Sequence, residues 1–169
     1  MSLRPPAHRI SPRTMLQWGL EYLLGALTLT GLASVAAAWG ENGAWTWLPA
    51  ALDARIWWLP VIIGTLGLLV TLTAPVWRYQ VHRWEVSSDV VYTRIGWITR
   101  QWLLVPVSRI QTVDAEQGWI ERLLGLATLK INTASHQGSS ELTGLTAEQA
   151  TLLAAELARR AHDLRDDAT

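Results

Sequence analysis

Two long uncharged stretches constrain this chain more than any other feature. Nineteen residues without a charge run from Tyr22 to Gly40, and 21 more run from Ile56 to Val76. With their flanking residues, these stretches predict helices over about 15–39 and 56–76, joined by a loop over 40–55. Each helix is long enough to cross a hydrocarbon layer about 30 Å thick. The pattern therefore predicts a transmembrane hairpin over residues 15–76.

A signal peptide is the alternative for the first stretch, because Ala36-Ala37-Ala38 resembles a cleavage site. However, the apolar run is long for the core of a signal peptide, and a second span follows it. We therefore favour the hairpin.

Basic residues around the spans predict the orientation. We expect residues 1–14 to form a basic, irregular arm; it carries three Arg and no acid, and Arg78 and Arg83 follow the second span. Arg55 is the only basic residue in the loop between the spans. The positive-inside rule therefore predicts a multi-pass protein with both termini in the cytoplasm.

Aromatic residues and cations also cluster directly after the second span. The chain has 11 Trp and no Phe, and tryptophan is enriched where proteins meet the headgroup region of a membrane. We expect contact with the bilayer from five residues: Trp77, Arg78, Tyr79, His82 and Arg83.

The spans themselves carry two further signals. Glu21 lies about one turn inside the first span, and a carboxylate inside a membrane is a hypothesis for a functional site. We favour the alternative, in which Glu21 lies near the cytoplasmic interface and reaches toward Arg13 or Arg78. Small residues also recur on both spans, and we expect them to face each other or a second copy; they are Thr30, Ala33 or Ser34 and Ala37 on the first span, and Gly64, Gly67, Thr71 and Ala74 on the second.

From Tyr79 onward the pattern is typical of short strands followed by one helix. We predict strands over about 80–86, 90–95, 97–105, 109–116, 127–134 and 139–143, with a helical turn over 119–124 that Gly125 ends. Thr146 and Gln149 have the spacing of a capping box at the start of an amphipathic helix that reaches residue 162. Residues 163–169 form a polar tail. The pattern predicts an antiparallel barrel or bent sheet over 77–162, capped by the C-terminal helix.

Several motifs in this region together resemble those of a known family. They are Val105-Pro106-x-x-Arg109-Ile110-Gln111-x-Val113, then Arg122-Leu123-Leu124-Gly125-Leu126-Ala127-Thr128-Leu129, Thr133-Ala134, and Leu142-x-Gly144-Leu145. The pattern resembles the YdbS-like membrane proteins with a bacterial pleckstrin-homology (PH)-like domain, over roughly residues 79–160. The resemblance implies a PH-like barrel without established catalytic activity. It also implies a location in the bacterial inner or plasma membrane, and partnership with a longer membrane protein that repeats this domain.

The motif residues of interest are Pro106, Arg109, Ile110, Gln111, Arg122 and Gly125. Arg109 and Gln111 either contact a partner or a lipid headgroup, or complete hydrogen bonds beside Pro106, which lacks a backbone donor. We favour the second interpretation. Arg122 is similarly either a phosphate contact or a solvated charge, and we favour the latter. The short, mildly acidic turn Ser87-Ser88-Asp89 argues against inositol-phosphate binding.

The sequence predicts no catalytic, cofactor or metal site. It has no cysteine, its four histidines lack the spacing of metal ligands, and no phosphate-binding loop is present. A net charge of zero argues against nucleic acid. We therefore expect a non-enzymatic docking or scaffold protein at the bilayer, with a membrane-protein partner or a second copy of itself. The alternative is an accessory subunit of a membrane transport or export complex.

Overall fold

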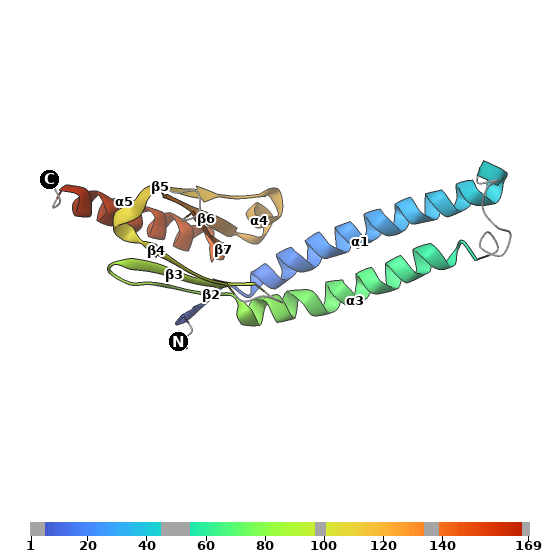
Figure 1. Ribbon diagram of the computed structural model, residues 1–169, viewed down its shortest axis with the longest axis horizontal. Coiled ribbons are helices and arrows are strands. Elements are labelled where there is room, and N and C mark those ends of the chain that lie inside the picture. Colours follow the sequence, from blue (N-terminus) through green and yellow to red (C-terminus); the bar gives the residue numbers. More distant parts are fainter. Residues whose placement is uncertain (1–5, 45–54, 97–100, 134–138, 167–169) are drawn as a thin grey trace. The chain divides into compact units, whose positions relative to one another are not determined.

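A computed structural model describes residues 6–44, 55–96, 101–133 and 139–166 of the chain, which forms two compact units. One unit, the hairpin unit, comprises residues 18–76. The other combines residues 1–17 with 77–169 and is called the domain below. Figure 1 shows helices in the first unit, and two sheets with a long C-terminal helix in the second.

Two long helices, which begin and end slightly beyond the unit boundaries, build the hairpin. They are α1 (Arg13–Trp39), followed by the single turn η1 (Gly40–Ala44), and α3 (Trp58–Val81). Both are long and apolar enough to cross a membrane. Many of their apolar side chains are exposed, Leu32 and Leu72 among them. A core helix of a water-soluble protein would bury such residues, so this surface suits lipid.

Small side chains let the two helices approach closely. A methyl group added at Gly64 would lie 3.4 Å from Thr30 Oγ1, and one added at Gly67 would lie 2.6 Å from Ala26 Cβ. The prediction that small residues of the two spans face each other is therefore confirmed at Gly64 and Thr30. Gly67 instead meets Ala26, which lies one turn before Thr30 and extends the predicted stripe.

The domain contains two antiparallel sheets. Strands β1 (His8–Arg9), β2 (Arg83–Val86), β3 (Val90–Ile95) and β4 (Gln101–Pro106) form the first, in that order. Strands β5 (Ile110–Glu116), β6 (Leu126–Thr133) and β7 (Ser140–Thr146) form the second. The turn η2 (Val107–Arg109) joins the sheets, and the helices are α4 (Trp119–Leu124) and α5 (Ala147–Asp166).

Both sheets and α5 contribute to one hydrophobic core. Val105 enters it from β4 of the first sheet, Val107 from the turn η2, and Leu129 from the second sheet. The predicted inner face of the C-terminal helix is confirmed, since Ala150, Leu157 and Ala161 are buried. The capping box is also confirmed, because Thr146 and Gln149 each donate a backbone N–H to the other's side chain at 3.2 Å.

The predicted antiparallel strands followed by one C-terminal helix are thus confirmed, although no strand pairing links the two sheets in the described ranges. Two predicted boundaries were wrong. A strand was expected from Gln80, but α3 continues to Val81, and the His82 N–H still donates to the Arg78 carbonyl at 3.1 Å in the helical pattern. Nothing between Pro75 and His82 breaks the helix, so it ends only where β2 begins.

Residues 1–14 were expected to be an irregular arm, but β1 lies within them and pairs with β2. A two-residue strand has no periodicity that sequence analysis can detect. The expected strand start at 97–100, the last residue of the strand expected over 127–134, and residues 45–54 of the expected loop lie outside the described residues.

Candidate docking surfaces

The N-terminal arm is a structural part of the domain. Besides the β1–β2 pairing, Ala7 N–H donates to Glu85 Oε2 at 3.0 Å, and the rings of His8 and Trp84 lie 5.0 Å apart. Ile10 is buried. The arm therefore adds the first strand of the first sheet, and it leaves the cations Arg9 and Arg13 exposed.

Gly144 explains how the arm fits against β7. Its φ is +77°, and an added methyl group would lie 2.5 Å from Thr14 Oγ1 and 3.1 Å from Ile10 Cβ. The Ser11 N–H donates to its carbonyl oxygen at 2.7 Å. Only glycine satisfies both the left-handed backbone and this close approach. The glycine of the Leu142-x-Gly144-Leu145 motif is thus the docking point of the arm.

The end of α3 is fastened to the domain by His82 and Arg94. His82 Nδ1 lies 2.7 Å from the Arg78 carbonyl oxygen, which can only accept, so the Nδ1–H donates. Arg94 Nε donates to the Val81 carbonyl at 2.9 Å. Burial is the main cause that lowers the pKa of His82, and the charges of Arg78 and Arg94 lower it further.

This geometry revises the expected membrane contacts. Trp77 is 63% exposed, and Arg78 and Tyr79 are half-buried. His82, by contrast, is only 6% exposed, so its imidazole is a structural group of the domain and not a lipid contact. Arg83 is half-buried within β2, and its Nε has no hydrogen-bond partner among the described residues.

Helix α4 is short but is held at both ends. The buried Glu121 accepts hydrogen bonds from the Gly118 N–H and the Thr128 hydroxyl, both at 2.7 Å. Gly125, with φ +68°, ends the helix, which confirms the predicted helical turn. Arg13 Nη1 donates to the Leu124 carbonyl at 3.3 Å. The helix is therefore presented in a defined position.

The outer side of α4 carries an apolar surface. Trp119 is 68% exposed and Leu123 is 78% exposed, and their spacing of four residues puts them on one face. These two residues and Arg122 are called the α4 ridge below; with Gln117 they line a shallow hollow. No other large apolar side chain in the described part of the domain is as exposed.

A second apolar surface lies on β4. Trp102 is 41% exposed and Leu104 is 51% exposed, whereas Val105 is buried. Trp102 and Leu104 point to the same side of the strand, and they are called the β4 ridge below. Strand β4 pairs with β3 and ends its sheet, so its other edge carries no strand in the described ranges.

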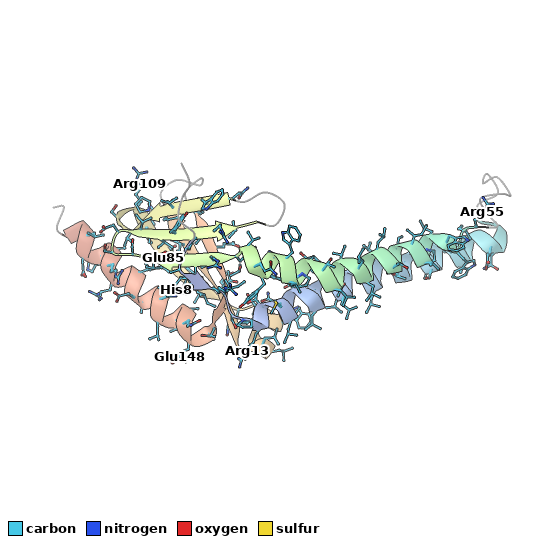
Figure 2. All side chains as sticks on the ribbon, turned by 90° about the horizontal axis from the view of Figure 1, so that it is seen from below. His8, Arg13, Arg55, Glu85, Arg109 and Glu148 are labelled. Carbon is cyan, nitrogen blue, oxygen red and sulfur yellow. The ribbon has the colours of Figure 1, made fainter. Side chains whose placement is uncertain are left out.

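The family-motif residues divide into core and surface. Ile110 is buried, and Pro106 precedes η2, whose Val107 N–H donates to the Asp89 carbonyl at 2.8 Å. Arg109 and Gln111 are exposed, and Figure 2 shows Arg109 pointing away from the domain. Within the described residues, neither side chain forms a hydrogen bond or ion pair. The role of this pair stays a prediction.

The titratable groups of the domain that pair with one another do so mainly on its surface, as Lys130 does with Glu116 at 2.8 Å. Apart from His82, the shifted pKa values in the described ranges belong to surface pairs. Hydrogen bonding to Glu116 raises the pKa of Lys130, and hydrogen bonds from Arg160 and Arg159 lower the pKa of Glu156. No group of three or more His, Asp or Glu side chains that could hold a metal occurs in the described part of the chain. Glu21 lies exposed on α1, and its role stays a prediction.

Comparison with known proteins gives two matches. The family model described as "Bacterial PH domain" matches residues 19–161. The chain is also 32% identical over 164 residues to the UPF0699 transmembrane protein YdbS of Bacillus subtilis (strain 168), and the alignment covers 96% of this chain and 97% of that protein. No solved structure matches significantly.

Proposed function

Because the chain belongs to the bacterial PH domain family, we propose that it is a membrane-anchored docking protein without catalytic activity. Its PH-like domain presents an interaction surface at the cytoplasmic face of the cell membrane. The observation that carries this proposal is the β4 ridge, where an exposed tryptophan and leucine lie on a strand at the end of its sheet.

An edge strand offers unpaired backbone N–H and C=O groups to another chain. An extended segment of a partner can add to such an edge, and exposed side chains on alternate positions then select among segments. Trp102 and Leu104 are two residues apart and supply apolar contacts of this kind. The proposed occupant is an extended segment of a membrane protein, or of a second copy of this chain.

The contact with lipid in this proposal comes first from the attachment of the domain. Trp77 follows the apolar run of α3 directly, and Arg78 and Tyr79 come next in the same helix. Tryptophan and tyrosine prefer the headgroup region, and each cation near anionic lipid contributes about 1 kcal/mol. Arg9 and Arg13, exposed on the arm, add to this attraction.

A photo-crosslinking residue in place of Leu104 tests the docking proposal in living cells. We expect a crosslinked species from position 104 and none from Leu152, a matched leucine that is 65% exposed on α5. Adding Trp102→Glu should remove the adduct, because a charge replaces the apolar contact.

Equal adducts from both positions, or none from position 104, would contradict the proposal. A multi-span transport protein as the crosslinked partner would identify the chain as the accessory subunit of a transport complex.

A further inference from the structure

We propose that the α4 ridge is a second membrane-contact site, which inserts into the interfacial layer of the bilayer that holds α1 and α3. Trp119 and Leu123 would lie at the boundary between headgroups and acyl chains, and Arg122 would lie against lipid phosphate. The ligand is thus the phospholipid surface itself. The proposal depends on the chain being a transmembrane protein and is independent of docking at the β4 ridge.

The composition of the ridge fits this interfacial layer. Tryptophan prefers the headgroup level because its ring is apolar and its N–H is polar. Removing the surface of a leucine from water lowers the free energy, and Leu123 is 78% exposed. The exposed Arg122 adds a charge that pairs well with phosphate. Aromatic, aliphatic and cationic side chains therefore occur together on the six-residue helix α4.

The opposite side of α4 is packed against the domain, which turns the ridge outward. Ile120 and Glu121 are each 7% exposed, and the Glu121 carboxylate is anchored to Gly118 and Thr128. The ridge is therefore not a mobile loop that happens to expose a leucine. Its apolar side chains cannot turn inward without breaking two hydrogen bonds to a buried carboxylate.

The position of α4 in the domain favours lipid over a protein partner. Arg13, whose guanidinium binds the Leu124 carbonyl at the end of α4, is the first residue of α1. Leu16, one turn further along α1, is already 61% exposed, and there the apolar surface of the predicted span begins. One turn of helix rises about 5.4 Å. The end of α4 is therefore bonded to the first turn of the helix whose continuation is the first predicted span.

The absence of cysteine from the sequence allows a direct test on the full chain. Leu123→Cys and Leu152→Cys, each labelled with the environment-sensitive fluorophore NBD, provide a matched pair of exposed leucine positions. Both proteins are reconstituted into vesicles of phosphatidylcholine with a minor share of phosphatidylglycerol and a doxyl quencher near the headgroup. We expect a blue-shifted emission and several-fold stronger quenching at position 123 than at position 152.

A second pair of variants tests the role of the side chains. Trp119→Ser in the Leu123→Cys background should reduce the quenching, because the ridge loses its larger apolar anchor. Arg122→Gln should reduce it more in vesicles that contain phosphatidylglycerol than in pure phosphatidylcholine. Circular dichroism and gel filtration of each labelled protein show that it is folded and of unchanged size.

Equal quenching at positions 123 and 152 in folded protein would overturn the proposal. A blue shift at position 123 without lipid quenching would also overturn it, since the ridge would then be covered by protein. Crosslinking at Leu104 is read separately, so failure of the lipid contact and failure of the docking function are distinguishable.

Discussion

His82 is the buried titratable group at the end of α3, and its lowered pKa predicts a pH dependence of stability. The unfolded chain binds a proton near the ordinary value of 6.5, whereas the folded domain binds it only at lower pH. The unfolded state therefore takes up more protons just below pH 6.5, and the free energy of unfolding falls as the pH falls. Above that value, both states are neutral and this contribution to the pH dependence vanishes.

The measurement is the melting temperature of the full chain in detergent on either side of pH 6.5. We expect the loss below this pH to be smaller in His82→Gln, whose amide can still donate to the Arg78 carbonyl. His162→Gln, at an exposed position on α5, is the control and should keep the slope of the unaltered protein. Identical slopes in all three proteins would show that His82 does not carry the effect.

Gly144 predicts a second effect at the scale of one residue. In Gly144→Ala the left-handed backbone costs about 1–2 kcal/mol. The contact with Thr14 and Ile10 adds about 1–3 kcal/mol of overpacking. We expect a lower melting temperature and faster tryptic cleavage after Arg9 and Arg13, because the arm loses its docking point.

Gly118→Ala is the matched control for that change. The φ of Gly118 is −67°, and an added methyl group would meet only Glu121 Oε2 at 3.5 Å, an ordinary contact. The melting temperature of Gly118→Ala should lie close to that of the unaltered protein. If Gly144→Ala also kept the melting temperature and the trypsin resistance of the unaltered protein, the close packing of the arm on β7 would be refuted.

At the scale of elements, the contact between α1 and α3 predicts that the side chains of Ala26 and Gly67 can be exchanged, as long as one of the two positions keeps a glycine. Gly67→Ala would bring two methyl groups within 2.6 Å, and we expect it to lower the stability of the hairpin by about 1–3 kcal/mol. Ala26→Gly combined with Gly67→Ala removes the opposing methyl group and should restore most of the loss. Close approach matters in lipid because the hydrophobic effect does not drive helices together there. Their association depends on van der Waals packing instead.

Thermal unfolding in detergent measures both variants, and Gly31→Ala serves as the control because nothing lies within 4 Å of the added methyl group. A double variant no more stable than Gly67→Ala alone would argue against the observed pairing of the two helices.

At the scale of the whole molecule, the charge distribution predicts the topology. Asn42→Cys lies between the two spans, and Leu152→Cys lies in the domain, so an impermeant maleimide distinguishes them in spheroplasts. We expect labelling of Asn42→Cys in intact spheroplasts, and labelling of Leu152→Cys only after permeabilisation. The reverse pattern would contradict the proposed cytoplasmic location of the domain. Asn42 is preferred to Gly43, whose φ of +79° disfavours any side chain.

Local signals were sufficient for the parts of the molecule that depend on neighbouring residues. The uncharged runs predicted both long helices, because crossing a membrane requires only length and apolarity. Thr146 and Gln149 marked the start of α5, and Gly125 marked the end of α4, because capping interactions join residues a few positions apart. The motifs from Val105 to Leu145 identified the family for the same reason, since they could be read directly along the chain.

The tertiary structure decided which residues lie exposed on the surface and which are buried and hold the elements in place. His82 looked like a membrane contact but is buried, and the pairing of β1 with β2 joins residues far apart in the sequence. The position of α4 is fixed by the Thr128 hydroxyl, which donates to Glu121 from β6, and by Arg13, which binds the Leu124 carbonyl from 111 residues away in the chain. The local pattern of the chain does not encode such contacts, since each depends on packing between elements that come together only when the domain folds.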